Sequence, residues 1–290
     1  MGRNDNRMNL PEGTEEVTAA GVATNVPPST DTPQFNWTVP TEIVPLPSQG
    51  RFYPDGHPLH GETTAEIRFM TAKDEDILTS RALLKEGLAI DRLLQNILVN
   101  KDIEVNSLLV GDKNALIVAA RITGYGDEYN TNVTCPSCDT VGEYSFELSV
   151  EDNTKDIDIH IESHEATRTE NNTFVVELPL TKANVECRLL TGKDELKLAK
   201  EAQRRSKKKQ NETTLTSQLK SFIVSVNGDS NPLALAAFVQ TLPARDSRYL
   251  RSFYSDITPN LDMNQVYECA SCGYTADMEV PLTADFFWPK

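Results

Sequence analysis

The stretch Ala65-Glu-Ile-Arg-Phe-Met-Thr-Ala-Lys-Asp-Glu-Asp-Ile-Leu78 returns later in the chain, without a gap, as Val185-Glu-Cys-Arg-Leu-Leu-Thr-Gly-Lys-Asp-Glu-Leu-Lys-Leu198. Seven of the fourteen aligned positions are identical, far more than chance would give, which indicates an internal duplication. Each copy is expected to start as an alternating strand and to continue as a helix. Thr71 and Thr191 suit the helix N-cap, and the acidic residues behind them suit the positive end of the helix dipole.

The parallel continues downstream, though more faintly. In the first copy an apolar helical stretch at 88–99 leads through 105–110 to a helix at 112–122; in the second, 215–226 leads through 233–242 to a helix at 244–257. Each copy then ends in a Cys-x-x-Cys hairpin. The sequence therefore predicts an α+β fold of two strand–helices–hairpin units, related by a pseudo-twofold axis and carrying a zinc-ribbon-like pair of knuckles.

Four of the five cysteines form two pairs, Cys135-Pro-Ser-Cys138 and Cys269-Ala-Ser-Cys272. Strand-like runs flank both pairs, at 128–134 and 142–150 for the first and at 264–268 and 275–280 for the second. A Cys-x-x-Cys at a hairpin tip directs two thiolates at one cation, and two such knuckles complete a tetrahedral zinc site. If the two copies pack about a twofold axis, one structural Zn²⁺ would join them.

Other interpretations of the cysteines remain open at this stage. The two hairpins could stand apart, each held by packing alone, or the pairs could do redox chemistry. A redox Cys-x-x-Cys opens a helix after a strand, whereas these flanks favour strands on both sides. Cys187, in an alternating run, is expected to point into the core as a small apolar side chain.

The composition is that of a globular protein, with 39% hydrophobic and 24% charged residues among 290, enough for one large domain or two smaller ones. The net charge of −15 argues against a general nucleic-acid or membrane-surface binder, because phosphate affinity comes from clustered positive charge. No apolar run approaches the roughly 18 residues that a membrane span needs, and the first residues lack the apolar region of a secretory signal. We therefore expect a soluble protein made in the cytosol.

Composition and pattern divide the chain into five parts. They are a disordered arm at 1–38, a Pro/Gly-rich docking segment at 39–60, a first repeat unit at 61–150, connecting strands at 151–182, and a second repeat unit with a C-terminal tail at 183–290. The arm is too polar to bury the surface that would offset the entropy of ordering, although it could order against a partner. The apolar end of the tail, 286–290, is either docked or a contact surface.

Two shorter expectations concern the second and fourth parts. Phe52 and Tyr53 are expected to dock the Pro/Gly-rich segment on the body of the protein. In the connecting part, period-two alternation at 156–162 and at 173–178 predicts two strands joined by a polar turn.

One cluster of positive charge interrupts the acidic sequence. Seven of the 28 basic residues lie within 197–209, namely Lys197, Lys200, Arg204, Arg205, Lys207, Lys208 and Lys209. The simple interpretation is a solvated helix end that suits the helix dipole. The alternative is an electrostatic contact with an acidic protein or with DNA, and the lack of interleaved aromatics disfavours DNA.

Little in the sequence predicts catalysis. His57 and His60 lie in the Pro/Gly-rich turn, and His160 and His164 lie on or after a polar run; all four are weak candidates, spare as metal ligands. No phosphate-binding loop, nucleophile elbow, zinc-protease helix or dinucleotide fingerprint occurs. The repeated Lys-Asp-Glu is better explained as a duplicated helix start than as acid–base machinery. We expect no enzyme and no catalytic residues.

Three segments resemble the T4-type bacteriophage baseplate protein family. They are Val44-Pro-Leu-Pro-Ser-Gln-Gly-Arg-Phe-Tyr-Pro54, Met70-Thr-Ala-Lys-Asp-Glu-Asp-Ile-Leu-Thr-Ser-Arg81, and Val110-Gly-Asp-Lys-Asn-Ala-Leu-Ile-Val-Ala-Ala-Arg-Ile122 with the Cys-Pro-Ser-Cys138 hairpin behind it. The resemblance is good over 42–150 and looser beyond. Its motifs are long and specific.

The resemblance implies a non-enzymatic role in the baseplate hub of a contractile-tailed phage. Family members are regarded either as hub components or as assembly factors absent from the finished particle. The implied partners are other baseplate and tail proteins, with no membrane and no nucleic acid, and the implied location is the virion tail baseplate after synthesis in the host cytoplasm. A zinc-dependent or thiol-active enzyme and a nucleic-acid-binding regulator are the competing classes.

Overall fold

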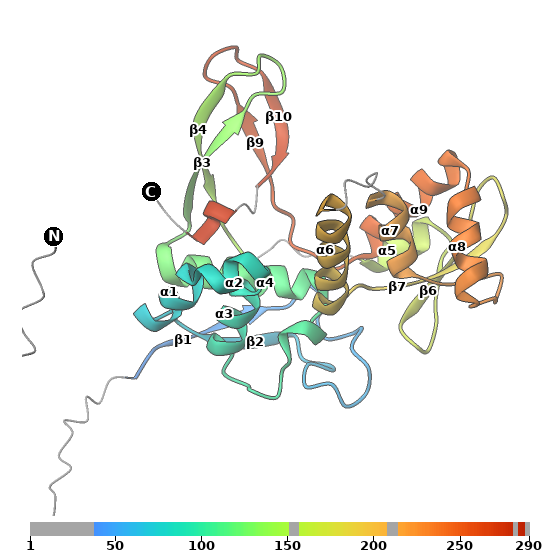
Figure 1. Ribbon diagram of the computed structural model, residues 1–290, viewed down its shortest axis with the longest axis horizontal. Coiled ribbons are helices and arrows are strands. Elements are labelled where there is room, and N and C mark those ends of the chain that lie inside the picture. The colour runs from blue at the N-terminus through green and yellow to red at the C-terminus, as the bar shows by residue number, and fades with distance from the viewer. Residues whose placement is uncertain (1–37, 151–156, 208–213, 281–283, 288–290) are drawn as a thin grey trace, which may run out of the picture. The chain divides into compact units, whose positions relative to one another are not determined.

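The computed structural model describes residues 38–150, 157–207, 214–280 and 284–287. The chain divides into two units, Met1–Thr38 and Val39–Lys290, and every described helix and strand belongs to the second unit (Figure 1). The predicted disordered arm at 1–38 therefore falls outside the described residues, apart from Thr38.

Residues 39–150, here called the N-terminal half, combine two small hairpins with helices. Its elements are β1 (Thr41–Pro45), β2 (Thr64–Arg68), α1 (Ala72–Thr79), α2 (Arg81–Glu86), α3 (Ala89–Ile97), the short helix η1 (Val105–Ser107), α4 (Val110–Tyr125), β3 (Glu128–Thr134) and β4 (Val141–Glu147). The docking segment behaves as expected, because Phe52 and Tyr53 are only 5% and 1% exposed.

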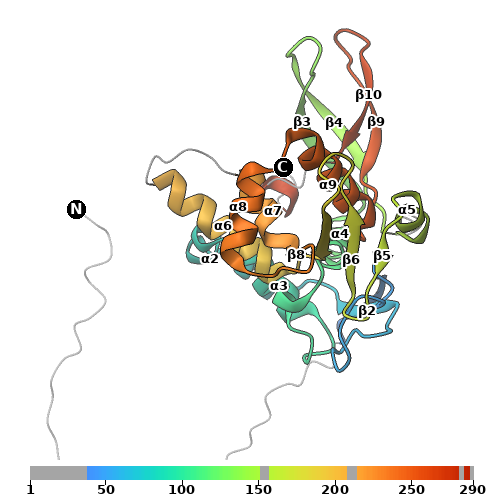
Figure 2. The ribbon, with the colours of Figure 1, turned by 90° about the vertical axis from the view of Figure 1, so that its right-hand side faces the viewer.

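Residues 157–287, here called the C-terminal half, contain a four-stranded antiparallel sheet in the order β5-β6-β7-β8; its strands β5, β6 and β8 are labelled in Figure 2. Its elements are α5 (Ile157–Ser163), β5 (Thr167–Arg168), β6 (Thr173–Glu177), β7 (Asn184–Arg188), α6 (Gly192–Lys207), α7 (Thr214–Phe222), β8 (Ile223–Val226), α8 (Pro232–Thr241), α9 (Ala244–Ile257), β9 (Asn264–Glu268), β10 (Thr275–Glu279) and η2 (Ala284–Phe287). The fold is thus mixed α+β, as predicted, and its strands form small sheets.

Each half begins with an antiparallel hairpin that leads into a helix. Val44 of β1 lies opposite Ala65 of β2, and Val176 of β6 lies opposite Val185 of β7. These four side chains are buried on the core-facing side of their strands, as the period-two pattern requires. The strand before the repeated sequence is therefore present in both halves.

The repeated sequence also makes the same contacts in both halves. Arg68 binds both carboxylate oxygens of Asp74 at 2.6 and 2.9 Å, and Arg188 binds those of Asp194 at 2.8 and 2.7 Å. The N-cap amides of Thr71 and Thr191 donate to the same aspartates at 2.8 and 3.0 Å. The Lys-Asp-Glu triplet is thus a helix start whose aspartate links the cap to the preceding strand.

In each half, a buried aspartate in the first turn of a helix binds the segment that connects the two strands of the first hairpin. Asp112 of α4 accepts hydrogen bonds from the Ser48 amide at 2.9 Å and from the Tyr53 hydroxyl at 2.7 Å. Asp246 of α9 accepts from the amides of Leu180 and Thr181, both at 2.9 Å. Both carboxylates are fully buried, so these bonds satisfy groups that would otherwise be costly to desolvate.

The strand predicted at 156–162 is wrong, because 157–163 forms helix α5; Asp156 lies outside the described residues. Ile157 is buried, Ile161 packs against the core, and Ile159 is 61% exposed. Isoleucines four apart share one helical face, and the run is too short for its alternation to distinguish this from a strand. Packing of α5 against α9 decides in favour of the helix.

Two further expectations need adjustment. The apolar stretch at 215–226 is helical only as far as Phe222, after which β8 joins the sheet beside β7. The stretch at 233–242 lies mainly in the ten-residue helix α8, whereas its counterpart at 105–110 contains only the short helix η1. The helix predicted at 244–257 and the strand at 173–178 are confirmed.

The two halves meet through main chain at close range. The Val110 amide donates to Leu190 oxygen at 3.1 Å, and the Gly192 amide to Leu108 oxygen at 2.9 Å. A Cβ on Gly111 would lie 1.7 Å from the carbonyl oxygen of Pro259, so only glycine allows this approach. The halves therefore pack as parts of one body.

The end of the described chain returns to the N-terminal half. Phe286 and Phe287 are each 2% exposed. The buried Arg121 donates through Nε to the carbonyl oxygen of Phe286 at 2.8 Å, and the rings of Tyr129 and Phe286 meet edge to face at 5.1 Å. Of the two alternatives for the apolar tail, this part of it is docked.

Candidate metal centre

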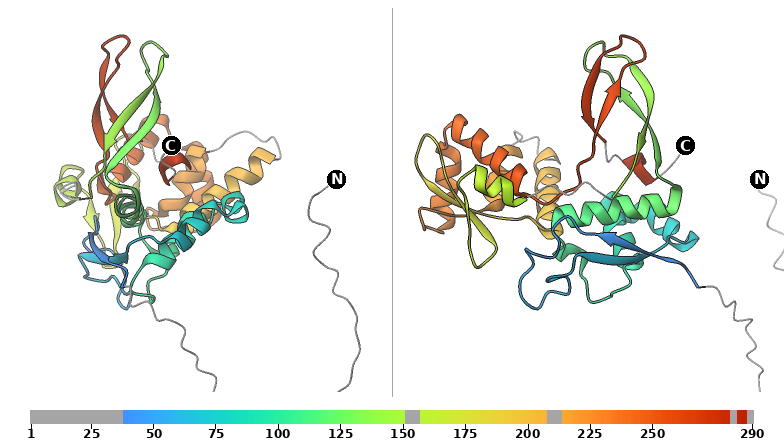
Figure 3. Two further views of the ribbon diagram at one scale, coloured as in Figure 1. Left: turned by 90° about the vertical axis from the view of Figure 1, so that its left-hand side faces the viewer. Right: turned by 180° about the vertical axis from the view of Figure 1, so that it is seen from behind.

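Two hairpins of matching form stand side by side, one from each half of the chain (Figures 1 and 3). β3 pairs with β4 and β9 pairs with β10, both antiparallel. β3 and β9 have the predicted bounds, and β10 starts as predicted and ends one residue early. β4 ends at Glu147 rather than at Val150. Each hairpin carries its Cys-x-x-Cys in the loop between the strands.

The two cysteine loops have the same backbone geometry. The Asp139 amide donates to Cys135 oxygen at 3.0 Å, and the Gly273 amide donates to Cys269 oxygen at 2.8 Å. Asp139 and Gly273 occupy equivalent positions and both have positive φ, 55° and 67°. This turn folds each loop back so that both of its cysteines point to the same side.

Contacts along their length hold the hairpins together. The Tyr144 hydroxyl donates to Val266 oxygen at 2.7 Å, and the rings of Tyr144 and Tyr267 lie 5.1 Å apart. The Gln265 side chain accepts from the Glu147 amide at 3.2 Å and donates back to the Glu147 carbonyl. The loops are therefore aligned by the strands beneath them, independently of the cysteines.

The four sulfur atoms form one compact cluster. All lie within 4.8 Å of one another, and the pairs Cys135–Cys272 and Cys138–Cys269, which join opposite hairpins, are both 3.8 Å apart. Four sulfurs bound at about 2.3 Å to one tetrahedral zinc ion lie about 3.8 Å from each other. The thiols are free rather than disulfide-bonded, so the donor set and its spacing fit a metal such as zinc.

The electrostatics of the cluster favour a cation. Amides of Cys272 and Ser271 lower the pKa of Cys269 to about 6, and the contact with Thr140 lowers that of Cys138. The Tyr274 amide acts to lower the pKa of Cys272, but the neighbouring thiols outweigh it and raise this pKa to about 12. Crowded thiolates repel one another, and a divalent cation would reverse that balance.

The structure separates the fifth cysteine from this cluster. Cys187 lies on β7, fully buried, and burial raises its thiol pKa. It is a core side chain, as predicted. For the other four cysteines, the alternative of two hairpins that stand apart is wrong, because the four sulfurs form one cluster. A redox Cys-x-x-Cys lies at the start of a helix, whereas strands flank both of these pairs.

The histidines take part in local structure. The His57 ring stacks on Tyr53 at 4.3 Å, and His60 Nδ1 contacts the Tyr53 carbonyl at 2.8 Å. His164 contacts Asp256 at 2.9 Å and Tyr249 at 3.3 Å. His160 lies on α5. Within the described ranges, the only cluster of three or more potential metal ligands is the cysteine cluster.

A family model described as T4 bacteriophage base plate protein matches residues 42–288. The chain belongs to this family. The match spans both Cys-x-x-Cys hairpins and both copies of the repeated sequence, which extends the sequence resemblance well beyond residue 150. No curated protein and no solved structure matches the chain.

Membership of the base plate family indicates a structural role in a phage baseplate, alongside other tail proteins. None of the described helices is both long and apolar enough to cross a bilayer.

Proposed function

We propose that this chain is a non-enzymatic structural or assembly protein of the baseplate hub region of a contractile-tailed bacteriophage. It binds other tail proteins and acts in the virion tail baseplate. The observation that carries the proposal is the family match over 42–288. The acidic, two-part body joined through a cysteine cluster suits a component held among protein neighbours.

The proposed metal ligands are Cys135, Cys138, Cys269 and Cys272, holding one structural Zn²⁺. The support is the 3.8 Å spacing between sulfurs of opposite hairpins, together with the matching loops. A structural zinc of this kind adds its binding free energy to folding, on the order of 10 kcal/mol or more. Here it would join the two halves rather than stabilise one local finger.

An internal duplication is the proposed origin of this arrangement. The paired Arg–Asp contacts, the hairpins β1–β2 and β6–β7, and the buried aspartates of α4 and α9 support it. The proposed units therefore start at the hairpins, near residues 41 and 173, rather than at 61 and 183.

The metal proposal is tested by replacing cysteines in the full chain. Cys135→Ser/Cys269→Ser should lose the bound zinc, which elemental analysis should find at about one ion per native chain, and should melt at a lower temperature. Cys187→Ala is the matched control, since it removes a buried thiol outside the cluster and should keep the zinc. Equal metal content in native chain and double variant would contradict the assignment.

The biological role is tested in the phage itself. Quantitative mass spectrometry of purified particles should find the chain in a fixed stoichiometric amount if it is a structural hub component. Presence in infected lysate but absence from particles would make it an assembly factor that leaves before completion. Phage carrying the double cysteine variant should build fewer complete tails; normal tail yield from zinc-free chain would overturn the structural role of the metal.

A further inference from the structure

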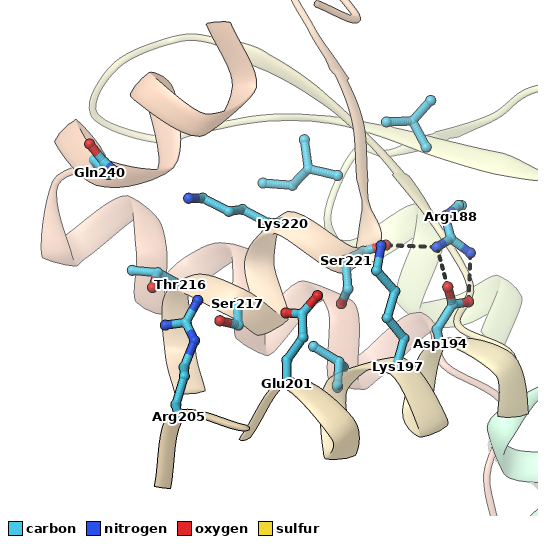
Figure 4. A pocket seen from close by; sticks show the side chains of 13 residues that line it. Arg188, Asp194, Lys197, Glu201, Arg205, Thr216, Ser217, Lys220, Ser221 and Gln240 are labelled. Carbon is cyan, nitrogen blue, oxygen red and sulfur yellow. Dashed lines mark hydrogen bonds and ion pairs between the residues drawn. The ribbon is translucent and has the colours of Figure 1, made fainter. Parts of the chain in front are cut away.

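A second candidate site lies in the C-terminal half, on elements between β7 and α8. Helices α6, α7 and α8 and strand β8 surround a cavity of about 850 Å³ (Figure 4). Ile223 and Val224 line it together with mainly charged and hydroxyl side chains. Two members of the basic cluster, Lys197 and Arg205, thus line a defined cavity, whereas Lys208 and Lys209 lie outside the described residues.

The charge of this cavity is opposite to that of the chain. Four cations line it against two acids, in a protein of net charge −15. Arg188 is paired with Asp194, but Lys197, Arg205 and Lys220 form no ion pair within the described parts of the chain. Lys220 comes from α7 and so lies outside the basic run seen in the sequence; only the fold shows that it belongs to the same site.

The corresponding place in the N-terminal half is closed. Leu78 of α1 is 1% exposed, whereas Leu198, seven residues after the N-cap as Leu78 is, is only half-buried and lines the cavity. The side chain of Asp74 is fully buried, and that of Asp194 is 16% exposed. The cavity is thus a specific feature of the C-terminal half and not a consequence of the shared hairpin and helix start.

An apolar surface adjoins the cationic cavity. Helix α8 consists largely of apolar residues, yet Leu233 is 81% exposed and, of the ten residues, only Val239 is buried. Gln240, which lines the cavity, follows Leu233 by seven residues, so the two side chains share one face of the helix. A helix that is apolar all round is normally covered, and this one has no cover over that face among the described residues.

We infer that this cavity and the adjoining face of α8 dock an acidic segment of a neighbouring tail protein that also carries apolar side chains. The inference rests on the proposed function for its partner class, and on charge complementarity for its chemistry. Lys197, Arg205 and Lys220 would meet the partner's carboxylates, while Leu233 would meet its apolar residues. A nucleic acid fits less well, because Asp194 and Glu201 lie inside the cavity and the surface beside it is apolar.

A binding measurement tests the site with purified full-length chain. The probe is a fluorescent dodecapeptide of Glu and Leu at helical spacing, followed by anisotropy at low salt. Lys197→Glu/Lys220→Glu should weaken binding by about tenfold or more, whereas Arg81→Glu/Lys85→Glu, the same charge change on exposed residues of α2, should leave it within about twofold. Both pairs are exposed, so both variants should keep the native melting temperature.

Several results would overturn the inference. They are equal weakening by the two double variants, equal binding of a peptide with Gln in place of Glu, or tighter binding of duplex DNA that is lost in Lys197→Glu/Lys220→Glu. In the phage, that variant should lower the yield of complete tails relative to the α2 control. Normal yield from it would overturn the docking site alone; complete tails of normal yield from phage that lacks the chain altogether would contradict the proposed function.

Discussion

The same arginine–aspartate pair is more deeply buried in one half of the molecule than in the other: Arg68 and Asp74 are 25% and 0% exposed, whereas Arg188 and Asp194 are 39% and 16% exposed. In the N-terminal half, the Asn96 side chain on α3 donates a hydrogen bond to Asp74. The chain reaches α3 from α1 through the short helix α2. In the C-terminal half the counterpart of this region is the longer α6, and Arg188 instead donates to the Ser221 carbonyl at 2.9 Å. In the N-terminal half the motif borders a closed core at Leu78, whereas in the C-terminal half it borders the cavity that Asp194 and Leu198 line.

The largest expected difference between the halves concerns the aspartates. Asp74→Ala should cost about 3–5 kcal/mol, because it leaves Arg68 without its buried partner. Asp194→Ala should cost about 1–2 kcal/mol, since Arg188 is 39% exposed and can be hydrated. Urea unfolding of both variants measures the two costs; equal values would show that the two environments do not differ as described.

A second contrast uses apolar side chains at matching positions. Leu78→Ala should destabilise by about 2–5 kcal/mol because it leaves a cavity in a closed core. Leu198→Ala removes a side chain that already borders open space, so we expect about 1 kcal/mol or less. A loss at Leu198 as large as that at Leu78 would mean that the cavity is closed in solution.

The smallest effect is the dependence of these contributions on acid. Burial acts to raise the pKa of Asp194, but the bonds from Arg188 and Thr191 outweigh it and lower this pKa to about 2 from 3.8. Stability from this carboxylate is therefore present above about pH 4 and lost as the pH falls toward 2. The destabilisation by Asp194→Asn should shrink across this range.

Asp74 provides the internal reference for that titration. Burial acts to raise its pKa as well, but hydrogen bonds from Arg68, Thr71 and Asn96 lower it further than that of Asp194. The destabilisation by Asp74→Asn should therefore persist to lower pH. Unfolding free energies measured in urea across the acid range would show the order, and the reverse order would contradict the assignment of the more strongly bonded site.

Much of the architecture was predictable because its signals are local. The cysteine hairpins are marked by alternating strands around a short loop, and the repeated helix starts by a cap with acidic residues behind it. The closeness of the cysteine pairs followed from the repeat, although 131 residues separate Cys138 from Cys269. The similarity of the two repeated segments thus predicted a contact that no local pattern around the cysteines could predict.

The sequence-based predictions were wrong or incomplete where tertiary contacts determine the local structure. Ile157 and Ile161 satisfy either a strand or a helix, and α9 selects the helix. Lys220 appears unremarkable in sequence, since only the packing of α7 beside α6 brings it to the cavity. The hairpin β1–β2 was missed as a unit because the turns at 46–63 separate its strands, and no local pattern links residues that far apart.

The cysteine cluster also determines when, during synthesis, the N-terminal half can complete its contacts. Cys135 and its neighbour Cys272 are 137 residues apart, which takes about 7–27 s to translate at about 5–20 residues per second. During that interval the first loop offers only two thiolates to a metal, and Arg121 lacks its acceptor until Phe286 has been made. The N-terminal half thus reaches its final form only after Cys272 and Phe286 of the C-terminal half have been made.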